Sequence, residues 1–216
     1  MAYRIIDTGD SRSFPNGDAF RAGAAEAGDV VAIIGRDPGP ALDALDTQGL
    51  AAVLVELGTQ CLGVHTGEAR GEEGSIVLGF ARFRLGDAPP TNLVELVRQP
   101  RSPDGAIAAA KTMFEAAGLK VAVCGDVPGR ILDRLLRPYW NAALRRLDDG
   151  LASADDMDTT LRLGLGYPEG PIALLERTGL AAHHDVTEAL HRALGDPAYA
   201  PARRAQVAKA RAMRGK

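Results

Sequence analysis

The stretch Leu163–Pro171, which reads LGLGYPEGP, is the clearest marker of architecture in the chain. It places glycine and proline between two segments whose apolar side chains recur at helical spacing. Glycine commonly ends a helix, and proline commonly begins one. We therefore expect Gly164 to end the helix before this stretch and Pro171 to begin the helix after it, with a tight turn between two packed helices.

From Pro128 onward the pattern predicts helices and no strands. Ile131–Leu147 repeats apolar residues at helical spacing, and Pro138 inside it should kink the helix because proline lacks an amide donor. Ser153 is the expected N-cap of the next helix, with Asp156 three residues later as a weaker form of the capping box. Further helices are expected from Pro171 to Gly179 and from about Ala182 to Leu194, with Gly150 and Gly195 as helix stops.

The first 126 residues alternate instead between short β-branched runs and alanine-rich helical patterns. This alternation favours an open α/β sheet with mostly parallel strands. Helices are expected at Asp18–Ala27 and at Pro103–Ala117, the second with Ser102 as its N-cap. The sequence thus predicts an α/β domain over residues 1–126 and an all-helical domain over residues 127–216. The predicted strands are Tyr3–Asp7, Asp29–Ile34, Ala51–Leu57, Ser75–Phe83, Leu93–Val97 and Lys120–Cys124.

The composition is that of an ordinary globular protein, with 25% charged and 46% apolar residues among 216. A net charge of −3 argues against a nucleic-acid-binding surface, which would need a basic stripe. No apolar run reaches the ~20 residues of a membrane span, and no signal peptide opens the chain. Cys61 and Cys124 do not form a disulfide framework. We therefore expect a cytoplasmic protein that binds neither nucleic acid nor a membrane.

The turn after the first predicted strand lacks the glycine fingerprint of a dinucleotide site. A Rossmann domain needs G-x-G-x-x-G there, because a Cβ would keep the diphosphate away from the helix N-terminus. Thr8–Ser13 offers one glycine, Gly9, between Asp7 and Asp10, whose charges would repel a diphosphate. We therefore expect no NAD in the usual binding mode.

The same turn also resembles the D-T-G loop of retroviral-type aspartic proteases, and Ile33–Arg36 resembles a later strand of those enzymes. That chemistry needs two aspartates that share a proton, supplied by a homodimer. Too few residues separate the two pieces to build the required barrel, so we set this interpretation aside.

Two signatures, in this order, resemble the carboxyl-terminal part of the 3-hydroxyacyl-CoA dehydrogenase family. They are Val127–Leu136, which reads VPGRILDRLL, and Leu163–Pro171; the likeness extends over roughly residues 75–210. The resemblance implies a truncated, degenerate Rossmann-like sheet followed by a helical domain like the C-terminal domain of 6-phosphogluconate dehydrogenase. In the family that helical domain forms the dimer interface and one wall of the acyl-CoA cleft. Similar units also occur as second, non-catalytic halves of longer dehydrogenases.

The resemblance implies a catalytic pair, of which this chain has one member. In the family, a histidine in an H-F-F-N-P motif takes the proton from the 3-hydroxyl, and a glutamate in an L-V-E-V segment orients that histidine. The segment here is Leu93–Val97, so Glu95 matches the glutamate. The histidine position falls on Ala81 when counted from Gly79, or on Phe83 when counted back from Glu95. Neither residue can act as a base.

Two further positions depart from the family. Asp133 replaces the asparagine of G-F-I-V-N-R-L, so a carboxylate that only accepts hydrogen bonds stands in place of an amide donor. Val55–Gln60 matches A-S-N-T-S-S with the serines gone. Glu95 and Asp133 are thus the candidate catalytic residues, expected to be vestigial. The simpler interpretation makes Glu95 a strand-end carboxylate in water or paired with Arg98 or Arg134, and Asp133 a helix-surface ion pair with Arg130, Arg134 or Arg137.

The histidines suggest one alternative base and no metal site. His65 would be a relocated base if its loop folded onto Glu95. His184 and His191 lie two turns apart on one predicted helix, whereas metal-ligand pairs on a helix usually lie one turn apart. No G-x-S-x-G elbow, Cys-His constellation or phosphate-binding G-x-x-x-x-G-K-[ST] loop is present.

Three functions follow as hypotheses. The preferred one is a 3-hydroxyacyl-CoA dehydrogenase homologue that is catalytically incomplete on its own. It would serve as a dimerising or acyl-CoA-binding module in fatty-acid or aromatic-acid β-oxidation. It would form a homodimer through the helical domain, with a complete dehydrogenase as a further partner. The second is an active NAD-dependent enzyme with a relocated base such as His65. The third is a ligand-free structural subunit. NAD is implied by the family alone, and we expect no bound cofactor.

Overall fold

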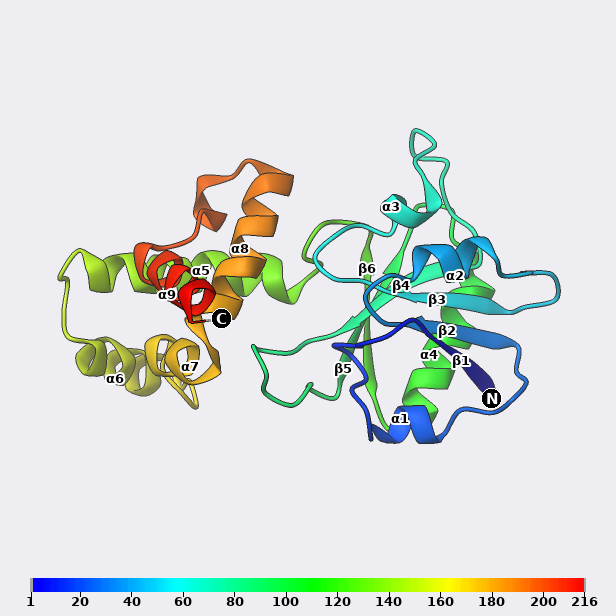
Figure 1. The fold of residues 1–216 in the computed structure, drawn as a ribbon, viewed down its shortest axis with the longest axis horizontal. Helices are drawn as coiled ribbons and strands as arrows, with labels where there is room; N and C mark the ends of the chain where they lie inside the picture. The colour runs from blue at the N-terminus through cyan, green and yellow to red at the C-terminus, as the bar shows by residue number, and fades with distance from the viewer. Residues whose placement is uncertain (1, 216) are drawn as a thin grey trace. The chain divides into compact units, whose positions relative to one another are not determined.

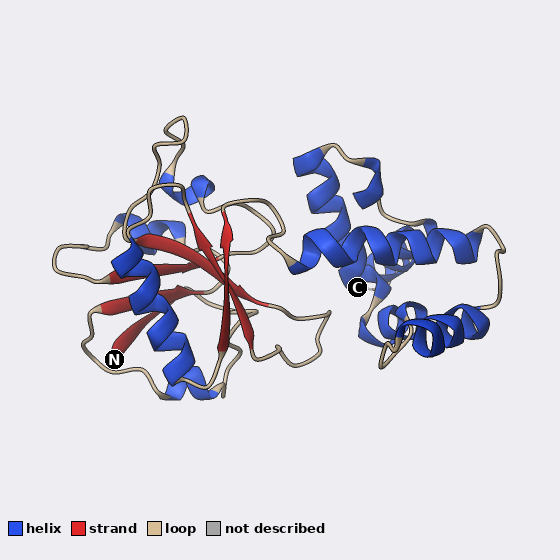
Figure 2. Ribbon diagram, turned by 180° about the vertical axis from the view of Figure 1, so that it is seen from behind, coloured by secondary structure: helices blue, strands red, loops and turns tan. Residues whose placement is uncertain are grey.

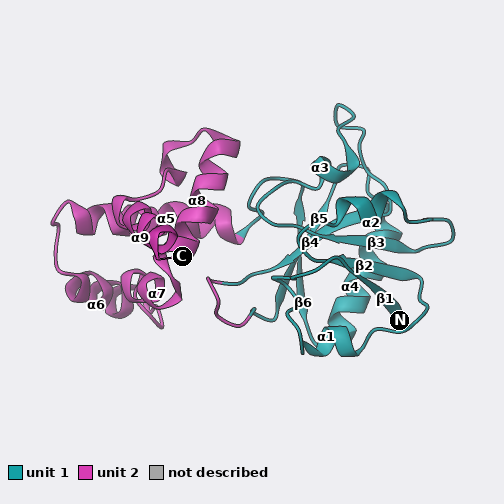
Figure 3. Cartoon of the chain, in the orientation of Figure 1, with its two compact units in different colours: residues 1–84, 90–131 teal, residues 85–89, 132–216 magenta. Residues whose placement is uncertain are grey.

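A computed structural model describes residues 2–215, and the chain forms two compact units (Figure 3). The first unit comprises Met1–Arg84 and Pro90–Ile131. The second comprises Leu85–Pro89 and Leu132–Lys216. Each unit is described by itself below.

The first unit is built on a six-stranded sheet whose strands lie side by side in chain order, from β1 to β6 (Figure 1). The first four strands are parallel, β5 runs antiparallel to β4, and β6 runs parallel to β5. The predicted mostly parallel sheet is therefore confirmed. The strands are β1 (Tyr3–Asp7), β2 (Val30–Ile34), β3 (Ala52–Glu56), β4 (Val77–Arg82), β5 (Leu93–Arg98) and β6 (Lys120–Gly125).

Apolar side chains cover both faces of this sheet. Every residue of β2 and β3 is buried, as expected for inner parallel strands that are covered on both sides. Helices α1 (Ala19–Ala22) and α4 (Asp104–Ala116) contribute to one face of the sheet (Figure 2). On that face the rings of Phe14, Phe20 and Phe114 stack. Helix α2 (Gly39–Asp43) packs on the other face, where Leu62 just before α3 (Gly63–Thr66) is also buried.

Two predictions for the helices of this unit are wrong, one in the length of a helix and one in its N-cap. The helix expected at Asp18–Ala27 is the single turn α1, because the next residues turn back to the sheet and the amide of Ala25 donates to the carbonyl of Tyr3. Asp18 caps that turn by accepting from the amide of Phe20. Ser102 is not the N-cap of α4, because its hydroxyl accepts from the amide of Gln99.

The second unit is all-helical, as predicted, and Ser153 caps its second helix by accepting from the amide of Asp156. Pro171 begins the following helix, as the sequence indicated. Gly164 does not end the helix before it, because Gly166 takes the left-handed conformation, at φ 72°, that the helix end requires. The helices are α5 (Leu132–Asp148), α6 (Ala154–Leu165), α7 (Pro171–Thr178), α8 (Leu180–Leu194), the 3₁₀ turn η1 (Pro197–Tyr199) and α9 (Arg203–Arg214). Within residues 2–215, no helix has the length and apolar character to cross a membrane.

Candidate functional site

Glu95 lies in the middle of β5, directly opposite Ala81 on the antiparallel neighbour β4. Opposed residues in such a pair point to the same face of the sheet, with Cβ atoms roughly 4.5–5.5 Å apart. An imidazole at position 81 would therefore stand beside the Glu95 carboxylate. Of the two positions counted for a base, the strand register selects Ala81, because Phe83 lies beyond the end of β4.

The Glu95 carboxylate is buried, with 2% of the residue exposed, and its charge partner is Arg130. The Arg130 Nε donates to Oε2 at 3.3 Å, and the amide of Ile131 donates to Oε1 at 2.8 Å. The expectation of a carboxylate in water, or one paired with Arg98 or Arg134, is therefore wrong. The true partner comes from the segment that follows β6.

Arg130 is held in an unusual conformation at this position. Its φ is 53°, in the left-handed region, directly after Gly129 at φ 77°. A non-glycine residue in this region costs on the order of 1–3 kcal/mol and persists only where its surroundings hold it. Glu95 supplies that restraint, because it accepts from both the Arg130 side chain and the next amide. One guanidinium nitrogen, Nη1, is buried without a hydrogen-bond partner.

An arginine in this place changes what the site can do. The guanidinium is not deprotonated in proteins, so it carries donors and charge but takes no proton from an alcohol. Cys124, on the neighbouring strand β6, offers no alternative: burial, followed by Glu95, raises the pKa of its thiol to about 11. The group therefore pairs a buried carboxylate with a guanidinium, beside a thiol that stays protonated at neutral pH.

The strand order around β1 differs from that of a doubly wound dinucleotide-binding sheet. In a doubly wound sheet the strand order reverses next to the first strand, and the dinucleotide binds in the crevice at that reversal. Among the described residues the order runs from β1 to β6 without a reversal, so β1 is an edge strand. The aspartates that follow β1 are neutralised locally: Asp7 pairs with Arg21 and Asp10 with Arg36. The pKa of Asp7 is lowered, first by the amide of Gly9 and also by Arg21.

A third acidic group lies at the same edge. Glu56, the last residue of β3, is 5% exposed and accepts from the amides of Ser13 and Gly35, each at 2.7 Å. A cavity of about 160 Å³ lies beside it, bordered by Asp10, Arg12, Gly35, Arg36, Glu56, Leu57, Gly58 and Gln60. This arrangement was not predicted, because the loops that follow β1, β2 and β3 are far apart along the chain.

Asp133 is also buried, and it pairs with Arg137 one turn later on α5, at 2.8 Å. The expected partner is among the three predicted, but the pair is enclosed and not on the helix surface. Arg137 Nη1 lies 3.0 Å from His183 Nδ1, and His183 Nε2 lies 3.0 Å from Asn141 Oδ1. Since arginine only donates, His183 accepts through Nδ1 and donates through Nε2. Burial, and then Arg137, lowers the His183 pKa to about 3.

His65 lies in α3, and its Nε2 is buried without a hydrogen-bond partner. A Cβ built on Gly39 would lie 3.7 Å from His65 Nδ1 and 3.9 Å from the Asp37 carboxylate, so these groups are neighbours beside α2. Sequence spacing gave no acidic neighbour for His65. Across residues 2–215, no three His, Cys, Asp or Glu side chains are arranged to hold a metal ion.

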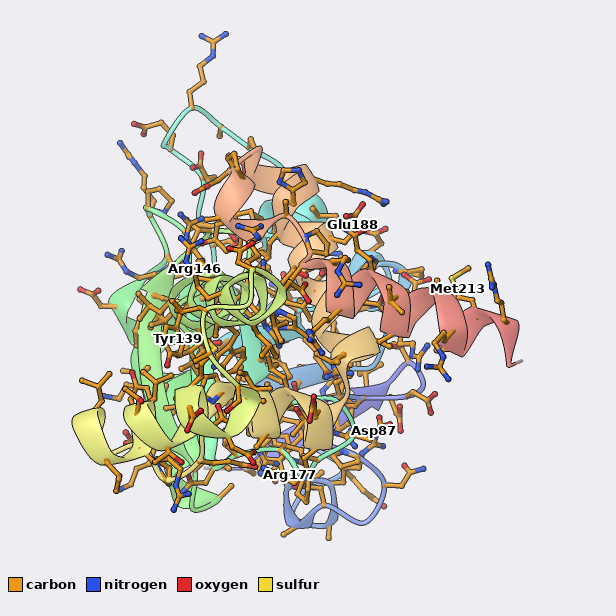
Figure 4. The ribbon with its side chains drawn as sticks, turned by 90° about the vertical axis from the view of Figure 1, so that its left-hand side faces the viewer. Asp87, Tyr139, Arg146, Arg177, Glu188 and Met213 are labelled. Carbon is orange, nitrogen blue, oxygen red and sulfur yellow. The ribbon has the colours of Figure 1, made fainter. Side chains whose placement is uncertain are left out.

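The helical unit carries an apolar cavity and several exposed apolar side chains. The cavity has a volume of about 240 Å³, and within its lining the rings of Tyr139 and Tyr167 meet edge to face at 6.1 Å. The hydroxyl of Tyr139, which is labelled in Figure 4, is buried without a hydrogen-bond partner. Met213 projects from α9 in the same figure and is 68% exposed. The exposed large apolar residues of this unit are Leu135, Leu151, Leu163, Leu165, Tyr167, Val207 and Met213.

A mostly parallel sheet followed by a helical unit is the fold class of two-part dehydrogenases, and in this sheet the buried Glu95 lies opposite Ala81. Residues 129–216 match the family model of the 3-hydroxyacyl-CoA dehydrogenase C-terminal domain. Residues 129–216 therefore belong to the 3-hydroxyacyl-CoA dehydrogenase C-terminal domain family, and the resemblance drawn from the motifs of this part is confirmed.

Similar proteins agree with this placement. The chain is 36% identical over 103 residues to the human mitochondrial hydroxyacyl-coenzyme A dehydrogenase, covering 48% of this chain and 33% of that protein. It is 32% identical over 117 residues to a 3-hydroxybutyryl-CoA dehydrogenase of Bradyrhizobium diazoefficiens, covering 54% of this chain and 40% of that protein. The chain thus spans a third to two fifths of the length of these relatives.

Solved structures extend the likeness into the sheet. The (S)-3-hydroxybutyryl-CoA dehydrogenase of Ralstonia eutropha superposes with a TM-score of 0.72 at 25% identity, over 85% of this chain and 66% of that one. FadB2 of M. tuberculosis superposes with a TM-score of 0.69 at 23% identity, over 83% of this chain and 65% of that one, which supports the fold alone.

Proposed function

We propose that this protein is a 3-hydroxyacyl-CoA dehydrogenase homologue that does not complete the reaction on its own. It acts as a dimerising or acyl-CoA-binding module in fatty-acid or aromatic-acid β-oxidation. The observation that carries this proposal is the strand pair that sets Glu95 opposite Ala81. A methyl group stands where the base of an alcohol dehydrogenase would be, and Arg130 compensates the glutamate charge.

The absence of a reversal in the strand order supports the same conclusion for the cofactor. A nicotinamide dinucleotide would find no crevice beside β1, because consecutive strands are neighbours throughout the described sheet. Hydride transfer needs an acceptor as well as a base. The protein is therefore proposed to lack both requirements for the oxidation.

The proposed partner is a second copy of the chain, bound through the helical unit. Helix α6 buries no side chain within its own chain, and Leu163 on it is 80% exposed. Most helical stability in proteins comes from packing an apolar face, so an uncovered helix of this kind favours assembly. Sedimentation of the pure protein measures whether this homodimer forms. A complete dehydrogenase is a further proposed partner.

The decisive experiment separates binding from turnover. With acetoacetyl-CoA and NADH we expect no loss of NADH absorbance, and with NADH alone no change in its fluorescence. Calorimetry with acetoacetyl-CoA should show saturable binding. Turnover in the wild-type protein that disappears in His65→Ala would replace the proposal with an enzyme that uses a relocated base. Absence of acyl-CoA binding in a protein that still dimerises would leave a ligand-free structural subunit.

A further inference from the structure

Glu56 joins three loops that follow three different strands. It is the last residue of β3, while Ser13 lies in the loop after β1 and Gly35 directly follows β2. Each carboxylate oxygen accepts one backbone amide at 2.7 Å, and the residue is 5% exposed. Hydrogen bonds from amides to an ionised acceptor are short and stronger than those between neutral groups.

The two amides form the kind of site that α/β sheets use for anionic ligands. Ligands of open α/β sheets lie outside the carboxyl ends of the strands, and converging backbone amides there bind phosphate and carboxylate oxygens. Gly35 has a φ of 120°, and a Cβ on it would meet Thr8 Oγ1 at 2.5 Å and the amide of Gly9 at 2.9 Å. This glycine therefore keeps the loop after β2 against the loop after β1.

Space for a larger anion lies next to these amides. The adjoining cavity, of about 160 Å³, is bordered by Glu56 itself and by the side chains of Arg12 and Arg36. Arg36 is exposed and lies 3.5 Å from the carboxylate of Asp10. Arg12 borders the same cavity, and its guanidinium donates to the carbonyl of Arg84 at 3.4 Å.

We propose that Glu56 is a built-in anion that occupies an oxyanion-binding site at the carboxyl ends of β1, β2 and β3. The site takes a free oxyanion of the carboxylate or phosphate class only when the Glu56 carboxylate is absent. The carboxylate keeps the loops after β1 and β2 ordered without a ligand and closes the site to diphosphate. This inference does not rest on the acyl-CoA-binding role, because neither Glu95 nor the helical unit takes part in it.

Anion rescue of Glu56→Ala tests the proposal. The substitution leaves two buried amides without an acceptor, so we expect the unfolding temperature to fall by several degrees. Acetate, phosphate or pyrophosphate should restore part of that loss with a saturable dependence on concentration, whereas chloride should not. The anion that restores most of the unfolding temperature of Glu56→Ala indicates the size of ligand that the site accommodates. Phosphate stabilises proteins in general through exclusion from their surface, which gives a rise without saturation.

Ile33→Ala is the matched control, because Ile33 is fully buried on β2 and its truncation removes volume without freeing an amide. The proposal is overturned if oxyanions raise the unfolding temperature of Glu56→Ala and Ile33→Ala alike. If Glu56→Ala does not fold, Glu56→Gln keeps one acceptor oxygen, and nuclear magnetic resonance follows the amides of Ser13 and Gly35 directly. Pyrophosphate should shift those two signals in Glu56→Gln and leave them unmoved in the wild-type protein. Equal shifts in both proteins, or none in either, would contradict the built-in anion.

Discussion

Each unit of the molecule buries one carboxylate against one arginine, but the two pairs are built differently. Glu95 and Arg130 lie 35 residues apart, on a strand and on a strained left-handed residue. Asp133 and Arg137 lie one helical turn apart and continue into the His183 and Asn141 side chains. In the α/β unit the pair lies opposite Ala81 of β4, whereas in the helical unit it joins α5 to α8. The comparison shows that the ion pair of the α/β unit joins residues distant in the sequence, whereas the ion pair of the helical unit forms within one helix.

The largest effect expected from this comparison is the loss of the Arg130 side chain. Arg130→Ala leaves the Glu95 carboxylate buried without its cation, and removing one partner of a buried ion pair typically costs about 3–5 kcal/mol. Denaturant unfolding at pH 7 measures the difference. Arg98→Ala, an exposed arginine on the same strand as Glu95, should change the unfolding free energy by less than about 0.5 kcal/mol. A loss of unfolding free energy below about 1 kcal/mol in Arg130→Ala would mean that the Glu95–Arg130 pair contributes little to the stability of this region.

The next effect concerns the helical unit in acid. His183 has a pKa of about 3 in the folded protein, lowered mainly by burial, against about 6.5 in the unfolded chain. Below pH 6.5 the unfolded state therefore binds a proton that the folded state does not bind. The contribution of the neutral His183 side chain to the free energy of unfolding is complete above pH 6.5. It is lost as the pH falls toward 3, by about 1.4 kcal/mol per pH unit.

The pH range from 7 to 5 suits a measurement of the His183 contribution, because most carboxylates begin to titrate below pH 5. Over that range we expect the wild-type protein to lose about 2 kcal/mol of unfolding free energy, and His183→Gln to lose much less. His184→Gln, one residue along the same helix, should keep the wild-type slope. Parallel slopes for the wild-type protein and His183→Gln would show that another group governs acid unfolding.

These contrasts also explain what the sequence could predict. Tyr3–Asp7 was predicted with its observed bounds, and Ser153 and Pro171 were placed correctly, because strand pattern, capping and helix initiation are local signals. The partner of Glu95 was missed because Arg130 reaches it from beyond β6 through a backbone conformation that arginine rarely adopts. Motif comparison left two positions, Ala81 and Phe83, for the family's histidine, and the register of β4 and β5 places Ala81 opposite Glu95.

The strand order and the role of Glu56 could not be predicted from local sequence patterns either. Alternating strands and helices fit either a reversed or a sequential strand order, and the structure shows the sequential one. Glu56 was aligned with a family serine, yet its two amide donors lie 43 and 21 residues away along the chain. The His183 network was missed for the same reason, because buried polar pairs depend on how helices pack.

The smallest expected effect separates two glycines within one loop motif. Gly166 has a left-handed φ of 72° at the end of α6, so Gly166→Ala should cost about 1–2 kcal/mol. Gly164 lies inside that helix, and a Cβ there meets no atom within 4 Å, so Gly164→Ala should stabilise the protein by about 0.5–1 kcal/mol. Thermal unfolding of the two variants side by side measures the difference, with the same methyl group added two residues apart. Equal changes in stability for the two substitutions would contradict a helix end at Gly166 and would support the predicted end at Gly164.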